Sequence, residues 1–139
     1  MSIPTETIAV PGLPGEAEIL VDRWGIPHIS AGSEAAVFFA QGFNAARDRL
    51  WQMDTWRKRG LGLLAGDLGP AYVERDRAAR LLLYRGDMAA EWAEYGPSAE
   101  AWTTAFAAGI NAWVDLVGRE AARLPLEFRL LGTTPQRWT

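Results

Sequence analysis

The sequence predicts an α+β fold that is mostly helical and begins with a β-hairpin. Two short apolar stretches on either side of a turn, residues 18–23 and 28–31, indicate the hairpin. A capped apolar run at residues 33–60 and a stripe of helical spacing at residues 102–117 indicate two long helices. The chain has 139 residues, which suffice for one domain but not comfortably for two.

Residues 1–17 are expected to form a loop or leader ahead of the hairpin. The run Pro11–Gly15 alternates prolines and glycines, which disfavours regular structure. The turn between the two strands falls at Trp24–Pro27, and its proline favours an edge position or a strand start. The domain itself then covers residues 18–139.

The first long helix carries start and stop signals. Ser33 is a good N-cap, and Glu34 suits the positive end of the helix dipole. The cations of Arg57–Arg59 suit the negative end, and Gly60 can close the helix in the left-handed conformation. Residues 35–40 are apolar nearly all round, which predicts burial on most sides.

Shorter helices are expected between the two long ones. Residues 61–68 form a short apolar piece that ends at Gly69, and helices are predicted at residues 72–84 and 85–94. The stripe of the second long helix recurs at steps of three and four, and its members are Trp102, Ala105, Phe106, Gly109, Ile110, Trp113, Val114 and Val117.

The C-terminal stretch is less regular. Residues 125–131 fit either a helical turn or a strand. Thr133–Pro135 predicts the start of another helix, with a threonine cap and a proline at the first position. Because the chain stops four residues after this proline, we expect residue 139 to be a cut rather than a natural end.

Composition excludes several classes of function. The net charge of -3 and the pI of about 5.2 argue against nucleic acid as a partner, since phosphate binding needs clustered positive charge. There is no cysteine, so a disulfide scaffold, a thiolate metal site and a cysteine nucleophile are excluded. No stretch is long and apolar enough for a membrane span. Met1–Glu6 does not resemble a signal peptide, so we expect a cytoplasmic protein, or a periplasmic or secreted one if a leader was removed.

Seven tryptophans are many for a domain of this size, because each indole buries a large area and needs a partner for its N–H group. They could form a tryptophan-rich core. We favour the alternative that some of them face a second chain, since aromatic residues are enriched at interface cores. The seven are Trp24, Trp51, Trp56, Trp92, Trp102, Trp113 and Trp138.

Few residues are candidates for catalysis. His28 is the only histidine, and we expect it to have a structural role in the hairpin rather than a place in a catalytic triad. Ser2 would become an N-terminal nucleophile if Met1 were removed. A nucleophile must be held rigidly, however, and Ser2 begins a proline-containing leader, so we do not expect it to be catalytic.

The densest polar cluster lies inside the first long helix and consists of Arg47, Asp48, Arg49, Gln52 and Asp54. One interpretation is a carboxylate placed for acid or base chemistry. We favour a buried ion-pair network that ties the helix to its neighbours, because flanking arginines stabilise the carboxylate and weaken it as a base.

Five segments, in this order, resemble the penicillin acylase (penicillin amidase) family of N-terminal-nucleophile hydrolases. The resemblance extends over about residues 18–138, which is nearly the whole chain. The segments are Val21–Ile29, Phe39–Phe43 continuing through Ala46–Asp54, Arg57–Gly60 with Leu63–Ala65, Ala105–Trp113, and Leu124–Phe128 leading to Pro135–Trp138.

This resemblance implies a precursor that cuts itself into a small α subunit and a larger β subunit. The present chain would be the N-terminal part of the α subunit, within a four-layer αββα fold that the β subunit completes. The N-terminal serine of β would be both nucleophile and base, and an oxyanion hole in β would stabilise the intermediate. Implied substrates are acyl amides such as penicillins, cephalosporin side chains, N-acyl homoserine lactones and lipopeptides. Many members of the family bind one structural calcium.

The resemblance transfers no catalytic, substrate-binding or metal-binding residue to this chain. In the family, the α residues that line the acyl pocket and the α ligand to calcium follow the segment that matches Pro135–Trp138. The matching motifs are therefore interpreted as scaffold, and no cofactor is expected within this chain. Two alternatives stay open at this point: a freestanding helical interaction module, and an inactive acylase.

Overall fold

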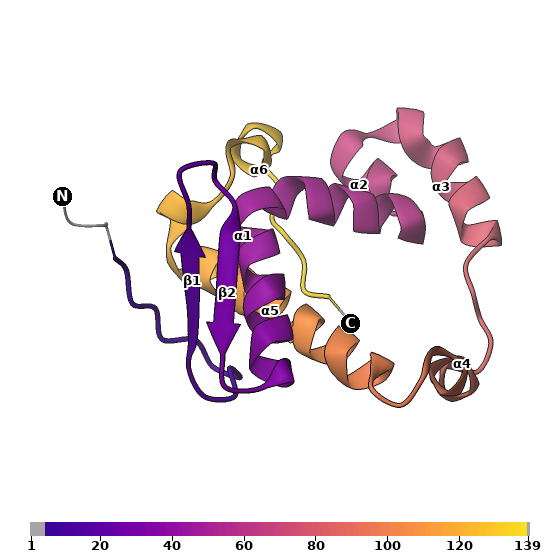
Figure 1. The fold of residues 1–139 in the computed structure, drawn as a ribbon. Helices are drawn as coiled ribbons and strands as arrows, with labels where there is room; N and C mark the ends of the chain where they lie inside the picture. The colour runs from indigo at the N-terminus through magenta and orange to yellow at the C-terminus, as the bar shows by residue number, and fades with distance from the viewer. Residues whose placement is uncertain (1–4, 139) are drawn as a thin grey trace.

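The computed structural model describes residues 5–138, and its N-terminal element is the predicted hairpin. Strand β1 (Ala17–Val21) pairs antiparallel with β2 (Pro27–Ala31), with Ala17 opposite Ala31 and Val21 opposite Pro27. Residues 5–16 contain no helix or strand, as the proline- and glycine-rich sequence predicts. The two strands lie alongside the first helix (Figure 1).

The turn of the hairpin is held by one aspartate. The Asp22 Oδ1 atom accepts hydrogen bonds from the backbone N–H groups of Trp24, at 2.8 Å, and of Ile26, at 2.9 Å. Gly25 supplies the positive φ of 78° that this tight turn requires. Local side-chain capping therefore sets the register of the two strands.

Helix α1 (Glu34–Leu61) begins where the sequence predicts, because the Ser33 side chain accepts a hydrogen bond from the N–H of Ala36. Its end differs from the prediction, since the left-handed C-cap is Gly62, with φ 65°, and not Gly60. A Cβ atom at Gly62 would lie 2.5 Å from the Asp76 carbonyl oxygen. The end of α1 is thus set by the close approach of Gly62 to the helix that contains Asp76, and not by the glycine that directly follows the basic residues.

Helix α5 (Ala99–Arg119) packs directly against α1, and glycines make the crossing possible. A Cβ atom at Gly42 of α1 would lie 2.0 Å from the Phe106 carbonyl oxygen, and one at Gly109 of α5 would lie 1.9 Å from the Phe39 carbonyl oxygen. The two backbones therefore touch without intervening side chains. The predicted stripe of α5 faces this contact, as its spacing requires.

The hydrophobic core lies between α1, α5 and the short helix α6 (Leu126–Leu131). Phe128 of α6 is fully buried and meets Trp51 edge-on, with ring centroids 4.9 Å apart. Phe43 meets Trp113 in the same way at 5.2 Å. The ambiguous stretch at residues 125–131 is therefore helical, and it closes one end of the core.

Three short helices lead from α1 to α5 and project away from this core (Figure 1). They are α2 (Leu64–Leu68), α3 (Val73–Leu81) and α4 (Met88–Tyr95). Helix α3 ends three residues before the predicted boundary, and residues 82–87 form a connection without helix. In the part of the chain that is described, no helix is both long and apolar enough to cross a bilayer.

The prediction of a new helix from Thr133 to Pro135 is wrong, because residues 133–138 contain no helix. The Thr133 N–H binds the Phe128 carbonyl of α6, and the backbone groups of Gln136 and Trp138 bind side chains of α1 and α5. The N–H of Gln136 lies 3.5 Å from Asp54 Oδ1, and both backbone groups of Trp138 bind Asn111. Tertiary hydrogen bonds have overridden a local helix-start signal.

Candidate functional site

The most deeply buried charged group among the described residues is the carboxylate of Asp54, with a residue exposure of 1%. Its Oδ1 atom lies 3.1 Å from the Arg57 guanidinium, and its Oδ2 atom lies 2.8 Å from Lys58 Nζ. Lys58 also pairs with Asp67 of α2. Two carboxylates and two cations thus form a neutral network, named here the Asp54 hub, which joins the last turns of α1 to α2.

The protonation of Lys58 reflects this environment. Burial disfavours the charged ammonium, but the hydrogen bonds to Asp54 and Asp67 outweigh that effect and hold the pKa of Lys58 above its ordinary value. A lysine that keeps its proton cannot serve as a base, and both oxygens of the Asp54 carboxylate are already paired with cations. The Asp54 hub is therefore suited to joining elements rather than to proton transfer.

The polar cluster predicted from the sequence is split into two by the structure. Asp54 is buried within the hub, which agrees with the interpretation as an ion-pair network. Asp48 is instead exposed, where it accepts hydrogen bonds from Arg47 Nε at 3.0 Å and Asn44 Nδ2 at 3.1 Å. Gln52 and Arg49 are also exposed, and the helix is kinked at Arg49. The five residues do not converge on one site.

Three polar residues that matter structurally were not singled out from the sequence. Lys58 completes the hub, and Asp76 caps α2 by accepting the N–H groups of Leu64 at 3.1 Å and Ala65 at 2.7 Å. Asn111 is not a member of the predicted apolar stripe of α5, yet it is only 8% exposed, so the buried face of this helix is wider than the stripe predicts. An asparagine flanked by Ile110 and Ala112 is the signal that could have identified it, since buried amides need partners.

The remaining sequence candidates do not form a catalytic arrangement. His28 is exposed, and its Nε2 atom lies 3.3 Å from Asp22 Oδ2, so it belongs to the hairpin turn as expected. The hydrogen bond from the N–H of Ile26 is the largest effect that holds the pKa of Asp22 below its ordinary value. Ser2 lies outside the described residues. Within residues 5–138, no group of three or more acidic or histidine side chains is placed to hold a metal ion.

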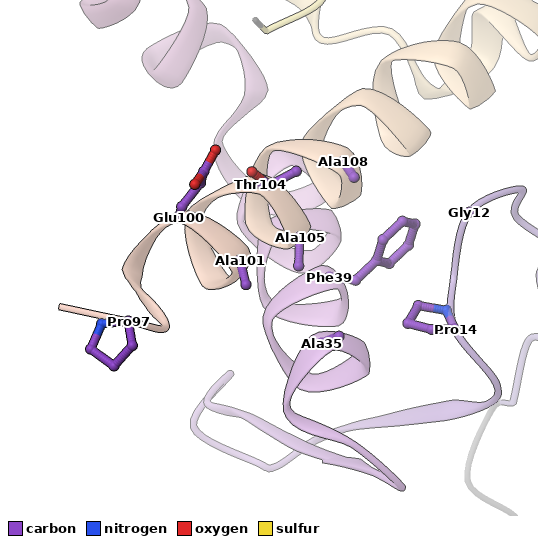
Figure 2. Close-up of a pocket in the computed structure, with 10 residues that line it drawn as sticks. All are labelled: Gly12, Pro14, Ala35, Phe39, Pro97, Glu100, Ala101, Thr104, Ala105 and Ala108. Carbon is purple, nitrogen blue, oxygen red and sulfur yellow. The ribbon is translucent and has the colours of Figure 1, made fainter. Parts of the chain in front are cut away.

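Two open grooves flank α5. The first, of about 450 Å³, lies between the start of α5, the start of α1 and the N-terminal loop. In Figure 2 the Phe39 ring extends from α1 toward the N-terminal loop that contains Gly12 and Pro14. Glu100 and Thr104 are the polar side chains among the residues that line this groove. The second, of about 630 Å³, lies beside the end of α5 and is lined by Leu124 and Pro135 among others. Neither pairs a nucleophile with a base, so both are interpreted as surfaces for packing.

Large apolar side chains are exposed on the projecting helices and on the hairpin turn. Trp24, Trp56 and Trp102 are 75%, 63% and 38% exposed, so three of the seven tryptophans reach the surface. Exposed apolar area on this scale, around a small core, is typical of a surface that contacts another chain. The other exposed side chains of this kind include Leu81, Leu82, Tyr84, Met88 and Tyr95.

In comparisons with known proteins, residues 16–139 match the family described as penicillin amidase. Penicillin acylase 2 proenzyme of a Pseudomonas species (strain SE83) is 36% identical over 132 residues, which cover 95% of this chain and 16% of that protein. Acyl-homoserine lactone acylase QuiP of Pseudomonas aeruginosa is 30% identical over 129 residues, 93% of this chain and 15% of that protein.

A solved structure is also similar to this fold. The thermostable penicillin G acylase from Alcaligenes faecalis aligns with a TM-score of 0.81 at 30% identity, and the alignment covers 89% of this chain and 66% of that one. The arrangement of hairpin and helices is therefore shared with a solved acylase. The chain spans only about a sixth of the length of the curated relatives it matches.

Proposed function

The chain belongs to the penicillin amidase family, and we propose that it is the N-terminal part of the α subunit of an acylase that hydrolyses N-acyl amides. One observation carries the proposal: the family match runs over residues 16–139, and the fold aligns with a solved penicillin G acylase. The relatives are named as acylases for penicillin and for acyl-homoserine lactones, so the proposed substrate class is an acyl chain joined to an amine by an amide bond.

The proposed chemistry uses an N-terminal serine on a separate β subunit. Its Oγ attacks the amide carbonyl carbon while its own α-amine takes the hydroxyl proton. That proton passes to the leaving amine as the C–N bond breaks, which leaves an acyl-serine ester. Water then cleaves the ester and releases the acid. The absence of a paired nucleophile and base within residues 5–138 is consistent with a catalytic centre on another chain.

This chain's own part in the proposal is to provide scaffold. Helices α1 and α5 form a rigid pair, and the Asp54 hub fixes α2 and the C-terminal segment to that pair. The exposed apolar side chains of α3 and α4 support a β subunit as the partner, because a free chain would present them to water.

The described residues do not fit the structural calcium that the resemblance implies. Calcium takes six to eight oxygen ligands, usually with several carboxylates. The buried carboxylates of this segment are already bound: those of Asp54 and Asp67 by Lys58, and that of Asp76 by backbone N–H groups. A calcium site in the complete enzyme would therefore use residues outside 5–138.

The test is to purify the complete enzyme and assay it for release of amine and acid from a panel of penicillins and N-acyl homoserine lactones. Intact-mass spectrometry under denaturing conditions should show an α subunit that contains this segment, together with a second, longer chain that begins with serine. Replacement of that serine by alanine is the matched control and should abolish release. A single species near 15.3 kDa that releases no amine would contradict the proposal and would favour a freestanding module or an inactive acylase.

A further inference from the structure

Residues 136–138 are held at every position although they have no regular secondary structure. The side-chain oxygen of Gln136 lies 3.3 Å from Arg57 Nη2, and Arg137 forms an ion pair with Asp115. The indole of Trp138 packs against the main core. Helix α1 holds the first of these residues, and α5 holds the second and the third.

The tightest of these attachments is made by Asn111. Its Nδ2 atom donates to the Trp138 carbonyl oxygen at 2.8 Å, and its Oδ1 atom accepts from the Trp138 N–H at 2.7 Å. One amide side chain thus binds both backbone groups of one residue, as a neighbouring β-strand would. Because Asn111 is 8% exposed and both its polar atoms are used, the orientation of Trp138 is strongly determined.

The Asp54 hub reinforces this clamp from the other helix. Asp54 Oδ1 lies 3.5 Å from the Gln136 N–H while its charge is held by Arg57 and Lys58. Two buried polar groups, on helices distant in sequence, are therefore committed to the backbone of an extended segment. Such groups are costly to bury unless their bonds are made, so this segment cannot shift without losing several of them.

We propose that Asn111 is a positioning residue for the acylase reaction, because its clamp on Trp138 sets the path of the polypeptide that continues into the rest of the enzyme. This inference rests on the proposed function. The described residues offer no catalytic pair, and the relatives are about six times longer than this segment, so substrate contacts must come from polypeptide beyond it. Groups that contact substrate need rigid support from residues behind them, so a displaced segment would distort the binding surface and weaken substrate binding.

Two variants of the complete enzyme test the clamp. In Asn111→Asp the side chain keeps its size and can still accept the hydrogen bond from the Trp138 N–H. Its second oxygen, however, faces the Trp138 carbonyl oxygen and cannot donate the hydrogen bond that the amide donates. In Asn111→Leu both bonds are lost. We expect the KM for an N-acyl amide to rise by about tenfold or more in each. The kcat, expressed per site titrated with a serine-directed covalent inhibitor, should change much less, since the nucleophile is elsewhere.

Asp115→Asn is the matched control. Asp115 lies one turn further along α5 and pairs with Arg137 of the same segment, but both side chains are about half exposed. The KM of the Asp115→Asn enzyme should equal that of the wild type. Hydrogen exchange of the Trp138 amide should become faster in Asn111→Leu and stay unchanged in Asp115→Asn.

The outcomes separate the inference from the proposed function. A wild-type KM in both Asn111 variants overturns the positioning role. So does a loss of titratable sites with unchanged KM, because that pattern means reduced folding only. A wild-type enzyme that releases no amine from any acyl amide refutes the proposed function itself, and the positioning role falls with it.

Discussion

Substituting Gly109 by alanine should destabilise the enzyme, although alanine is the better helix former. The added Cβ would lie 1.9 Å from the Phe39 carbonyl oxygen and 2.8 Å from the Phe43 amide nitrogen. Normal van der Waals separation is about 3.5 Å, so α1 and α5 must move apart by roughly 1.6 Å. Both obstructing atoms belong to backbone, and no side chain can rotate to make room.

The magnitude follows from two opposing effects. Overpacking a core costs about 1–3 kcal/mol, and rigid backbone neighbours favour the upper end of that range. The better helix propensity of alanine offsets up to about 1 kcal/mol. We therefore expect a net loss of about 2 kcal/mol in the free energy of unfolding for Gly109→Ala.

Gly118→Ala supplies the matched control on the same helix. Nothing lies within 4 Å of a Cβ atom at Gly118, so only the propensity effect remains. This variant should be unchanged or more stable by up to about 1 kcal/mol. The assay is urea unfolding of the complete enzyme, followed by tryptophan fluorescence. A Gly109→Ala variant at least as stable as Gly118→Ala would refute the close crossing of α1 and α5.

Three further predictions concern the hub and the exposed surface. Asp54→Ala should lower the free energy of unfolding by about 3–5 kcal/mol, because it leaves Arg57 and Lys58 without their buried partner; a loss below about 1 kcal/mol in urea unfolding would contradict the hub. Because the pKa of Lys58 is raised on folding, its contribution to stability should be complete below pH 10.5 and should fade as pH rises through the higher folded pKa. The urea midpoint should therefore fall as the pH rises above 10.5 in the wild type and fall less steeply in Lys58→Met. Equal slopes would count against the hydrogen-bonded ammonium. Residues 1–139 expressed alone should be insoluble or molten. A molten chain would bind a hydrophobic dye and lack a near-UV circular dichroism signal. A soluble monomer with a cooperative thermal transition would show that the exposed apolar side chains need no partner.

Much of the fold was predictable because its signals are local. The hairpin depends on a turn that Asp22 caps within four residues, and α1 begins at Glu34 because Ser33 caps its first turn. The burial of α5 follows from the three-and-four spacing of its apolar side chains. The order of the motifs along the chain also indicated the penicillin acylase family, and the family match confirms it.

The candidate site was less predictable, because its polar residues find partners far along the chain. Asp54 was recognised as part of a network, but its ion pair with Lys58, the pairing of Lys58 with Asp67 and the contact of Asp54 with Gln136 were not. Asn111 lies beside the apolar stripe of α5 and not in it, so the three-and-four spacing gave no sign that its amide is buried. Its partner is 27 residues away, and no local spacing relates the two.

The sequence by itself determined the hairpin, the two long helices, the beginning of α1 and the family. Tertiary structure alone decided that α1 ends at Gly62, where the chain meets Asp76, and that residues 133–138 stay extended despite a helix-start signal. The physical reason is that caps and periodic burial act over one or two turns of chain. A hydrogen bond between Asn111 and Trp138 forms only when α1, α5 and the C-terminal segment have already come together, and once formed it outweighs the few tenths of a kcal/mol by which local propensities differ.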